Sequence, residues 1–477
     1  MHAYTPALHL ENLGDGDFKK RYGLKYAYVI GAMANGITSV EMVKAAGSAG
    51  MLAFFGAAGL AIDDIAKAIH DLKDNLRKAP FGFNLIHSPN DPELEKAVVK
   101  LYLDNRINLV SASAYLDLTL PLVYYRVKGI REDQNGQIIV PNRVIGKVSR
   151  VEVARKFFSP PPEKFLKILL EKQLITQEEA SLASHIPMVD DLTAEADSAG
   201  HTDNRPALSL FPTMIALRDE IVARHKYTKR PSVGLGGGIA TPYAAAAAFS
   251  MGAAYVLAGT IHQCCLESGI SQTVREMLAN ARQADVIMAP SADMFEMGVK
   301  VQVLKRGTMF PLRAAKLYEL YSNYDRFDSI PAKQRVMIER DYFRCSFEEE
   351  WEKTREFFLQ RDPEQINHGE RNPKIKMALV FRSYLGKSSM WAKIGDATRK
   401  IDYQIWCGPS MGAFNEWVKG SFLEKMENRD SITVAMNIIF GAAVIMRINW
   451  IKSQGIKIPP KADKITPMRT QKILELI

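Results

Sequence analysis

The sequence predicts an α/β fold, a closed (β/α)₈ barrel (TIM barrel) with an appended C-terminal α-helical domain. Eight short apolar runs recur through the first 260 residues, and helical patterns separate several of them. The runs are continuously apolar, which is typical of parallel strands buried on both faces. After about residue 310 the runs stop and long helical patterns follow. An open doubly wound sheet is the alternative, but eight units of this length favour a closed barrel.

The predicted strands cover residues 26–32, 50–56, 81–86, 107–113, 143–149, 186–196, 231–238 and 253–259. Between them we expect helices at 39–49, 62–76, 92–104 and 242–251. Asp91 and Thr241 each stand directly before a proline, which is typical of an N-cap followed by Pro at the first helical position. Strand–helix repetition of this kind predicts a parallel sheet.

Two intervals of the predicted barrel, within about residues 115–185, are longer than the pattern needs. Gln134-Asn135-Gly136 predicts the turn of a hairpin, and residues 160–184 predict two extra helices, all outside the barrel. We place the barrel in residues 1–310 and a basic helical region in 311–477. The helices expected there span 311–321, 346–360, 415–427 and 432–446. The last is the most apolar, but it is shorter than the roughly 20 residues of a membrane span, so we expect a buried helix and no membrane association.

The net charge of +9, from 62 basic and 53 acidic residues, lies entirely in the last third of the chain. Residues 1–300 carry 32 basic and 32 acidic side chains, and residues 371–400 alone carry eight Lys or Arg and one acid. Such an excess indicates an acidic partner. Nucleic acid is disfavoured because the basic stretch has no recognised nucleic-acid motif. Four cysteines without metal-ligand spacing, and a start without a signal-peptide core, predict a cytoplasmic protein.

The carboxyl ends of the predicted strands should carry the active site. Gly236, Gly237 and Gly238 end the seventh strand, and Gly259 and Thr260 end the eighth, where barrels often bind phosphate. Ile239 stands where a dinucleotide fingerprint needs its last glycine, so we reject that motif. Glycines that serve only tight turns remain the alternative.

His201 is the candidate acid or base, because its ordinary pKa suits proton transfer near neutrality. It follows Gly200 in a loop that also holds Asp197 and Asp203. A solvated or structural histidine is the alternative. The carboxylates Asp190, Asp191 and Asp293 have no metal-ligand spacing, so we expect no metal site. We expect these side chains to have surface or capping roles.

Six segments together resemble the flavin-dependent nitronate monooxygenase superfamily, and within it the trans-acting enoyl reductases of polyunsaturated fatty acid and polyketide synthases. They are GAMANGI (31–37), FGFNLIHSP (81–89), IPMVDDLTAEADSAGHTDNRP (186–206), VGLGGGIATP (233–242), FEMGVKVQVLKRGTMFP (295–311) and QIWCGPSMGAFNEWVKGSFL (404–423). The resemblance spans nearly the whole chain, and the third and fifth segments are the most specific.

The resemblance implies an FMN site at the barrel mouth. Gly237, Gly238, Gly259 and Thr260, with Gly236 and Gly200 beside them, would hold the cofactor; Ala32 and Met33 would line its ring system; Asn84, Ser111 and Lys147 would hydrogen-bond it. His201 matches the active-site histidine. One departure is Ala199, where the family has a second glycine before that histidine.

The implied reaction is reduction of enoyl thioesters by NADPH or NADH through FMN. The substrate would arrive on an acidic acyl carrier protein, with Lys374, Lys376 and Arg382 as the candidate docking residues. A nitronate monooxygenase and a non-catalytic synthase scaffold are the alternatives. Acyl chain length, stereochemistry and oligomeric state, monomer or homodimer, stay open.

Overall fold

A computed structural model describes residues 7–76, 79–89, 91–359 and 361–477. Gln360, the last residue of one predicted helix, lies outside the described residues, as do the first six residues of the N-terminal segment.

Eight parallel strands close into a barrel in the order β1-β10-β9-β8-β7-β4-β3-β2, which confirms the predicted fold class. Their bounds are β1 Tyr28–Ile30, β2 Leu52–Phe55, β3 Gly82–Ile86, β4 Leu109–Ser113, β7 Arg143–Val148, β8 Asp191–Glu195, β9 Ser232–Gly236 and β10 Val256–Ala258. Nearly all their residues are buried, because the barrel interior lies on one side and the surrounding helices on the other. Each strand falls within one predicted run.

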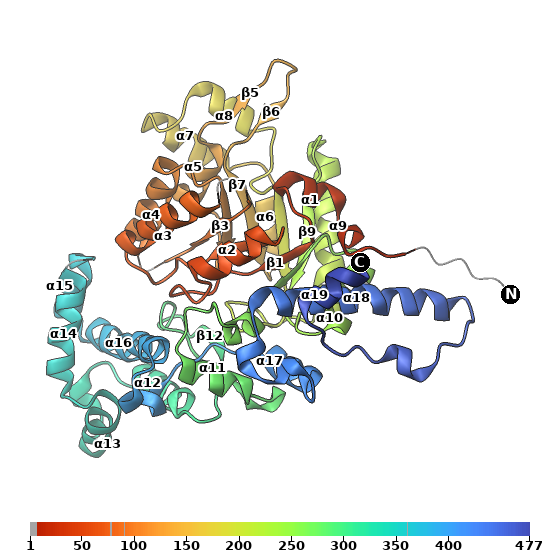
Figure 1. The fold of residues 1–477 in the computed structure, drawn as a ribbon. Helices are drawn as coiled ribbons and strands as arrows, with labels where there is room; N and C mark the ends of the chain where they lie inside the picture. Colours follow the sequence, from red (N-terminus) through yellow and green to blue (C-terminus); the bar gives the residue numbers. More distant parts are fainter. Residues whose placement is uncertain (1–6, 77–78, 90, 360) are drawn as a thin grey trace.

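Helices surround this barrel (Figure 1). They are α1 Gly16–Tyr22, α2 Val40–Ser48, α3 Ile62–Asn75, α4 Pro92–Asp104, α5 Leu120–Val127, α6 Val151–Phe158, α9 Ala207–His225 and α10 Pro242–Ser250. Helix α11 (Gln272–Ala279) lies outside this ring, and its buried Val274 and Leu278 belong to a separate hydrophobic cluster. The four predicted barrel helices are confirmed within two residues. The side chains of Asp91 and Thr241 cap α4 and α10, accepting hydrogen bonds from Leu94 N at 3.0 Å and Ala244 N at 3.3 Å.

The additions between the fourth and sixth barrel strands are also confirmed. Strands β5 (Arg131–Glu132) and β6 (Ile138–Ile139) form an antiparallel hairpin, and Gly136 takes the left-handed conformation in its turn. Two helices, α7 (Glu163–Glu171) and α8 (Gln177–Ala183), follow β7 and α6. All of them lie at the far end of the barrel from the helical region (Figure 1).

A second antiparallel hairpin, β11 (Val286–Pro290) with β12 (Lys300–Leu304), was not predicted. Its buried residues Ala289, Phe295 and Val303 belong to a second hydrophobic core, shared with the helices that follow. Those helices form a separate lobe in Figure 1: α12 Phe310–Asn323, α13 Ala332–Ile338, α14 Phe347–Leu359, α15 Pro363–Arg371 and α16 Pro373–Ile394. A third cluster joins Ile37 of the barrel to Ala392 of α16.

The C-terminal segment differs in part from expectation. The helix predicted at 415–427 is wrong: α17 spans Ser410–Val418, and Gly420 then takes a left-handed φ of 73° that ends the helical path. Short 3-10 turns follow. The helix predicted at 432–446 exists and is longer, as α18 (Ser431–Ser453), with α19 (Thr470–Leu476) beside it.

Helix α18 is long and apolar enough to cross a membrane by composition, but 67% of its most apolar window is buried in the protein. It lies along α10 (Figure 1), and Gly441 permits the close approach, because a Cβ there would meet Pro242 at 2.7 Å. Its apolar residues join the barrel core. The expectation of a buried helix is therefore confirmed. The division at residues 310 and 311 stays a prediction, since α18 packs on the barrel and β12 packs on the helical region.

Candidate active site

The residues after β1 and β10 meet at the carboxyl end of the barrel. A Cβ on Gly259 would lie 3.9 Å from Met33 Cγ, and no other atom in the described part of the chain would lie within 4 Å of it. The loop that carries Ala32 and Met33 is fixed by Thr38, whose hydroxyl accepts from Met33 N at 2.9 Å and donates to Gly31 O at 2.8 Å. Buried His262 lies just after Thr260 and is hydrogen-bonded to Tyr28 Oη at 2.8 Å, which ties this turn back to β1.

The three glycines that end β9 differ in what surrounds them. A Cβ on Gly236 would lie 3.0 Å from Thr193, and one on Gly237 would lie 2.7 Å from the Ala196 carbonyl. Gly238 has a φ of 73°, and among the described residues no atom lies within 4 Å of its Cβ position. Open space therefore lies beside this turn, which precedes the N-cap Thr241 of α10 by three residues, and the positive end of the α10 dipole favours a phosphate nearby. These residues fit the phosphate of FMN.

Asn84 and Ser111 are neighbours in register on β3 and β4, and both are buried. Asn84 Oδ1 accepts hydrogen bonds from Ala57 N at 2.7 Å and Ala58 N at 3.3 Å. Its amide nitrogen donates to none of the described residues, so it is free to bind a ring carbonyl or nitrogen of a ligand.

Lys147, predicted as a cofactor ligand, is paired within the protein. Its Nζ lies 2.6 Å from Glu195 Oε1, and little of either side chain is exposed. Gly200 packs over this pair, because a Cβ there would lie 3.1 Å from Glu195 Oε1 and 3.4 Å from Lys147 Nζ. A side chain at position 200 would therefore require the Glu195 carboxylate to shift by a few tenths of an ångström. Ala199 before it is buried, and its backbone lies beside Gly408.

His201 lies against the turn between β11 and β12. Its Nε2 is 3.1 Å from Ser291 Oγ and 3.1 Å from Asp293 Oδ1, and the Ser291 hydroxyl also donates to Asp293. Asp293 has 41% of its side chain exposed, which agrees with the expected surface position, but it is also the ion-pair partner of the candidate catalytic residue, a contact that was not expected. Asp197 and Asp203 instead hold the loop: Asp197 binds Asn204 and Gln302, and Asp203 binds Ser149 and Arg150.

This pairing changes the proton affinity of both groups. Burial lowers the pKa of His201, but the hydrogen bond and negative charge of Asp293 outweigh it, so the pKa is raised above its ordinary value. Burial raises the pKa of Asp293, but the hydrogen bond and charge of His201 outweigh that effect and lower the pKa to about 2. His201 therefore keeps its proton to a higher pH than a free histidine, as a proton donor near neutrality requires.

The pair Asp190 and Asp191 also has roles other than the expected surface or capping ones. Asp191 is fully buried, ion-pairs with Arg21 and accepts from Tyr22 Oη at 2.7 Å and Ser232 N at 2.8 Å. Asp190 pairs with buried Arg126 at 2.5 Å. Both carboxylates join barrel strands to surrounding elements, so they serve the fold.

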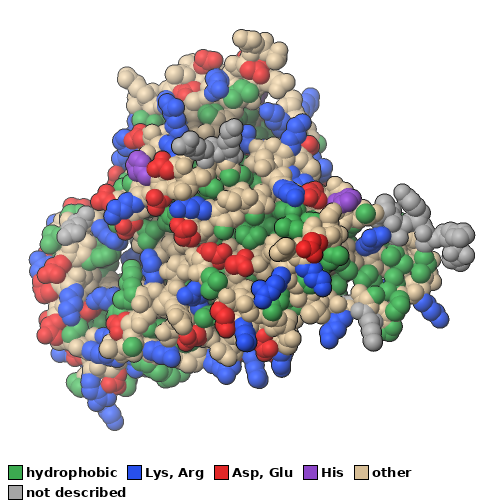
Figure 2. All heavy atoms as spheres, viewed as in Figure 1, with side chains coloured by type: hydrophobic (Ala, Val, Ile, Leu, Met, Phe, Trp, Pro, Cys, Tyr) green, Lys and Arg blue, Asp and Glu red, His purple; other side chains and the backbone are tan. Residues whose placement is uncertain are grey.

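The three predicted docking residues are largely engaged inside the helical region. Lys374 donates to Tyr321 O and to Tyr324 O, and Arg382 donates to Ala292 O at 2.9 Å and Glu296 Oε1 at 3.1 Å. Lys376 lies 3.9 Å from Glu348 and over the Trp351 ring. Basic and acidic side chains are also interspersed on the face in Figure 2. The basic stretch is therefore less free to bind a partner than its sequence suggests.

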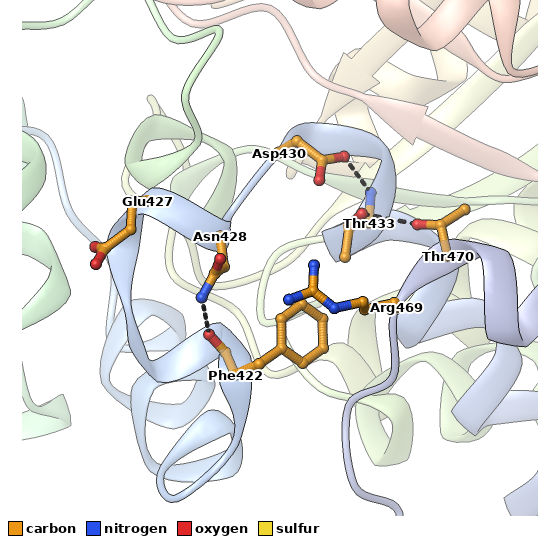
Figure 3. Close-up of a pocket in the computed structure, with 7 residues that line it drawn as sticks. All are labelled: Phe422, Glu427, Asn428, Asp430, Thr433, Arg469 and Thr470. Carbon is orange, nitrogen blue, oxygen red and sulfur yellow. Dashed lines mark hydrogen bonds between the residues drawn. The ribbon is translucent and has the colours of Figure 1, made fainter.

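A pocket of about 290 Å³ lies between the turns after α17, the start of α18 and the start of α19. Figure 3 shows the Arg469 guanidinium over the Phe422 ring, and Asp430 capping the backbone of Thr433. None of the predicted site residues lines it. We assign the site to the barrel mouth because the predicted residues converge there.

Sequence reasoning missed Ser291 and Gln302, and it missed the ion pair between Asp293 and His201. Gln302 Nε2 of β12 donates to Asp197 Oδ1 at 2.7 Å and so binds the loop that carries His201. The available signal was position: Ser291 and Asp293 directly precede the FEMGVKVQVLKRGTMFP segment, and Gln302 lies within it.

Comparison with known proteins matches the chain to two family models. Residues 19–322 match nitronate monooxygenase, and residues 324–403 match the inserted helical domain of [acyl-carrier-protein] S-malonyltransferase.

Among curated proteins, the chain is 45% identical to a polyunsaturated fatty acid synthase subunit of Thraustochytrium sp. over 93% of its length, which is 30% of that protein. It is 45% identical to polyketide biosynthesis protein PksE of Bacillus subtilis over 91% of its length, which is 57% of that protein. The chain thus spans about a third to just over half of these relatives. Among solved structures, the enoyl reductase domain of MlnA from the macrolactin cluster of Bacillus amyloliquefaciens matches with a TM-score of 0.89. That match has 39% identity and covers 93% of this chain and all of that domain.

Proposed function

The chain belongs to the nitronate monooxygenase family of oxidoreductases, and we propose that it is an FMN-dependent enoyl reductase of polyketide or polyunsaturated fatty acid biosynthesis. It would reduce the α,β-double bond of enoyl thioesters carried on acyl carrier protein, with NADPH or NADH as reductant. The free cysteines agree with a reducing, cytoplasmic setting.

One observation carries the proposal: the match to an enoyl reductase domain extends over barrel and helical region together. The match to nitronate monooxygenase ends at residue 322, so that family does not account for the helices after this residue. Residues 324–403 resemble instead a helical domain of a transferase that handles acyl carrier protein, which supports a carrier-bound substrate.

The cofactor half of the site lies on the barrel. FMN, when bound, supplies hydride transfer from the nicotinamide to the β-carbon of the enoyl thioester. Gly237, Gly238, Gly259 and Thr260 would hold its phosphate through backbone groups, and Asn84 would donate to its ring. The positive charge of Lys147 is balanced by Glu195, whose Oε1 lies 2.6 Å from Lys147 Nζ. We therefore expect this pair to form the floor of the site rather than to bind the phosphate.

The acid half of the site is His201. Its Nε2 is occupied by Ser291 and Asp293, and its Nδ1 is hydrogen-bonded to none of the described residues. Protonated Nδ1 would donate to the thioester carbonyl, stabilising the enolate charge that forms as hydride arrives, and would supply the proton for the α-carbon. The raised pKa keeps that proton available near pH 7.

Purified protein should be yellow and should turn over crotonyl thioester with a nicotinamide. His201→Ala should bind FMN and accept electrons from the nicotinamide at the parental rate, yet reduce the thioester about 100-fold or more slowly. Parental rates in both half-reactions would rule out the assigned role. Turnover of propionate nitronate without thioester reduction would favour the monooxygenase alternative, and protein without flavin would favour a scaffold.

The carrier protein remains the proposed partner, although the docking residues need revision. Lys376 is the only one of the three whose charge is not bound to a backbone carbonyl or to a close carboxylate among the described residues. Reversal by Lys376→Glu should raise KM for the carrier-bound substrate, with a smaller effect at high salt, and leave small thioesters unaffected.

A further inference from the structure

We propose that Asp293, assisted by Ser291, is the positioning residue of His201, and that Arg382 of α16 fixes the loop that presents both of them. The proposal rests on the proposed function only for the role of His201 as proton donor. The hydrogen-bond arrangement itself is independent of the substrate.

The first step is the orientation of the ring. His201 lies in the loop after β8 and Asp293, 92 residues later, in the β11–β12 turn, yet Nε2 lies 3.1 Å from both Ser291 Oγ and Asp293 Oδ1. Because the Ser291 hydroxyl donates to the same carboxylate, its oxygen accepts from His201. Nε2 must then carry a hydrogen, which leaves Nδ1 to change protonation during the reaction.

The second step concerns the charges around the ring. Asp293 faces it from the β11–β12 turn, Lys147 from β7 and Glu195 from β8. Lys147 and Glu195 largely cancel each other at 2.6 Å. Asp293 is then the dominant charge at the histidine, so its removal should lower the pKa of His201 more than any other single change.

The third step connects the acid to the helical region. Ala292, between Ser291 and Asp293, accepts a hydrogen bond from Arg382 Nε at 2.9 Å, and Arg382 Nη1 reaches Glu296 at 3.1 Å. Phe295 and Val303 of the hairpin share a core with Phe381 of α16. The barrel supplies the histidine, but the helical region holds the group that aims it.

The test uses flavin-loaded, full-length protein with ¹³C-labelled histidine, and His201→Gln assigns the signal of His201. The parental His201 should titrate above pH 6.5, and Asp293→Asn should lower its midpoint by about one pH unit or more. Asp293→Glu should restore part of the shift, and Ser291→Ala, which keeps the charge, should move the midpoint less. The alkaline limb of kcat for crotonyl thioester should follow the same order.

Arg382→Met should reduce kcat by the same factor for small and carrier-bound thioesters. Lys333→Met, which removes one exposed charge from α13 of the same helical region, should leave kcat for crotonyl thioester unchanged. A His201 midpoint that is the same in the parent and Asp293→Asn would overturn the positioning role. A change confined to KM of the carrier-bound substrate in Arg382→Met would overturn the link through α16. If the parent reduces no thioester, the proposed function fails, and the histidine titration still decides the role of Asp293.

Discussion

Gly237 and Gly238 are adjacent and both have left-handed backbone, yet alanine should affect them in different ways. At Gly238 the added methyl group meets no atom of the described residues within 4 Å. Gly238→Ala should therefore cost only the strain of a left-handed backbone, about 1–2 kcal/mol of unfolding free energy. At Gly237 the methyl group would lie 2.7 Å from the Ala196 carbonyl and 2.9 Å from Asp197 O. Overpacking against backbone adds about 1–3 kcal/mol.

Gly238→Ala, the variant with the smaller loss of stability, should have a clear loss of FMN affinity. The methyl group of Gly238→Ala enters the open space assigned to the FMN phosphate, so affinity should fall at least tenfold, about 1.4 kcal/mol, while the fold persists. Titration of FMN fluorescence with apoprotein measures affinity, and urea unfolding measures stability. Parental FMN affinity in a folded Gly238→Ala would refute the phosphate position. Equal unfolding midpoints for the two variants would refute the clash at Gly237.

Two further outcomes follow from ion pairs, one at the buried Asp191 and one at the partly exposed Asp293. Asp191→Asn leaves Arg21 without its carboxylate in the barrel wall, so unfolding should become easier by about 3 kcal/mol, seen as a lower thermal midpoint; an unchanged midpoint would contradict the assigned role. The stability difference between the parent and Asp293→Asn should be largest between about pH 4 and pH 6.5. Below this range it is lost as Asp293 protonates toward its pKa of about 2, and above it as His201 deprotonates through its raised pKa. A difference independent of pH would contradict the ion pair.

The barrel could be predicted from sequence because its strands are buried on both sides, which leaves continuous apolar runs with glycine or polar residues at their ends. The additions were predictable from Asn135-Gly136 and the helical pattern after it. The hairpin β11–β12 was not, because Ile287 and Met288 of β11 are exposed and no helix separates the two strands. Helix α16 was not predicted. Its basic residues, such as Lys374 and Arg382, are hydrogen-bonded to residues distant in sequence, which the sequence pattern does not indicate.

The same reasoning explains why the candidate site was only half predictable. In the proposed site the glycines at the ends of β9 and β10 would act through their own backbone, so their positions at strand ends are a sufficient signal. His201 acts through a partner, and that partner lies on a hairpin whose location depends on the tertiary fold. Asp197 and Asp203, its neighbours in sequence, bind Gln302 and Arg150 instead.

The contacts of Arg382 give part of the net charge of +9 a structural role. Arg382 contacts Glu296, which precedes the helical region in sequence. Arg382 also donates to the carbonyl of Ala292, which lies in the loop beside His201. Part of the basic excess of residues 301–477 thus holds the hairpin in place, so reversing charges along α16 changes two properties at once. Substitutions at Lys376, which contacts neither the hairpin nor a close carboxylate among the described residues, separate carrier binding from histidine positioning, because only carrier binding depends on the charge there.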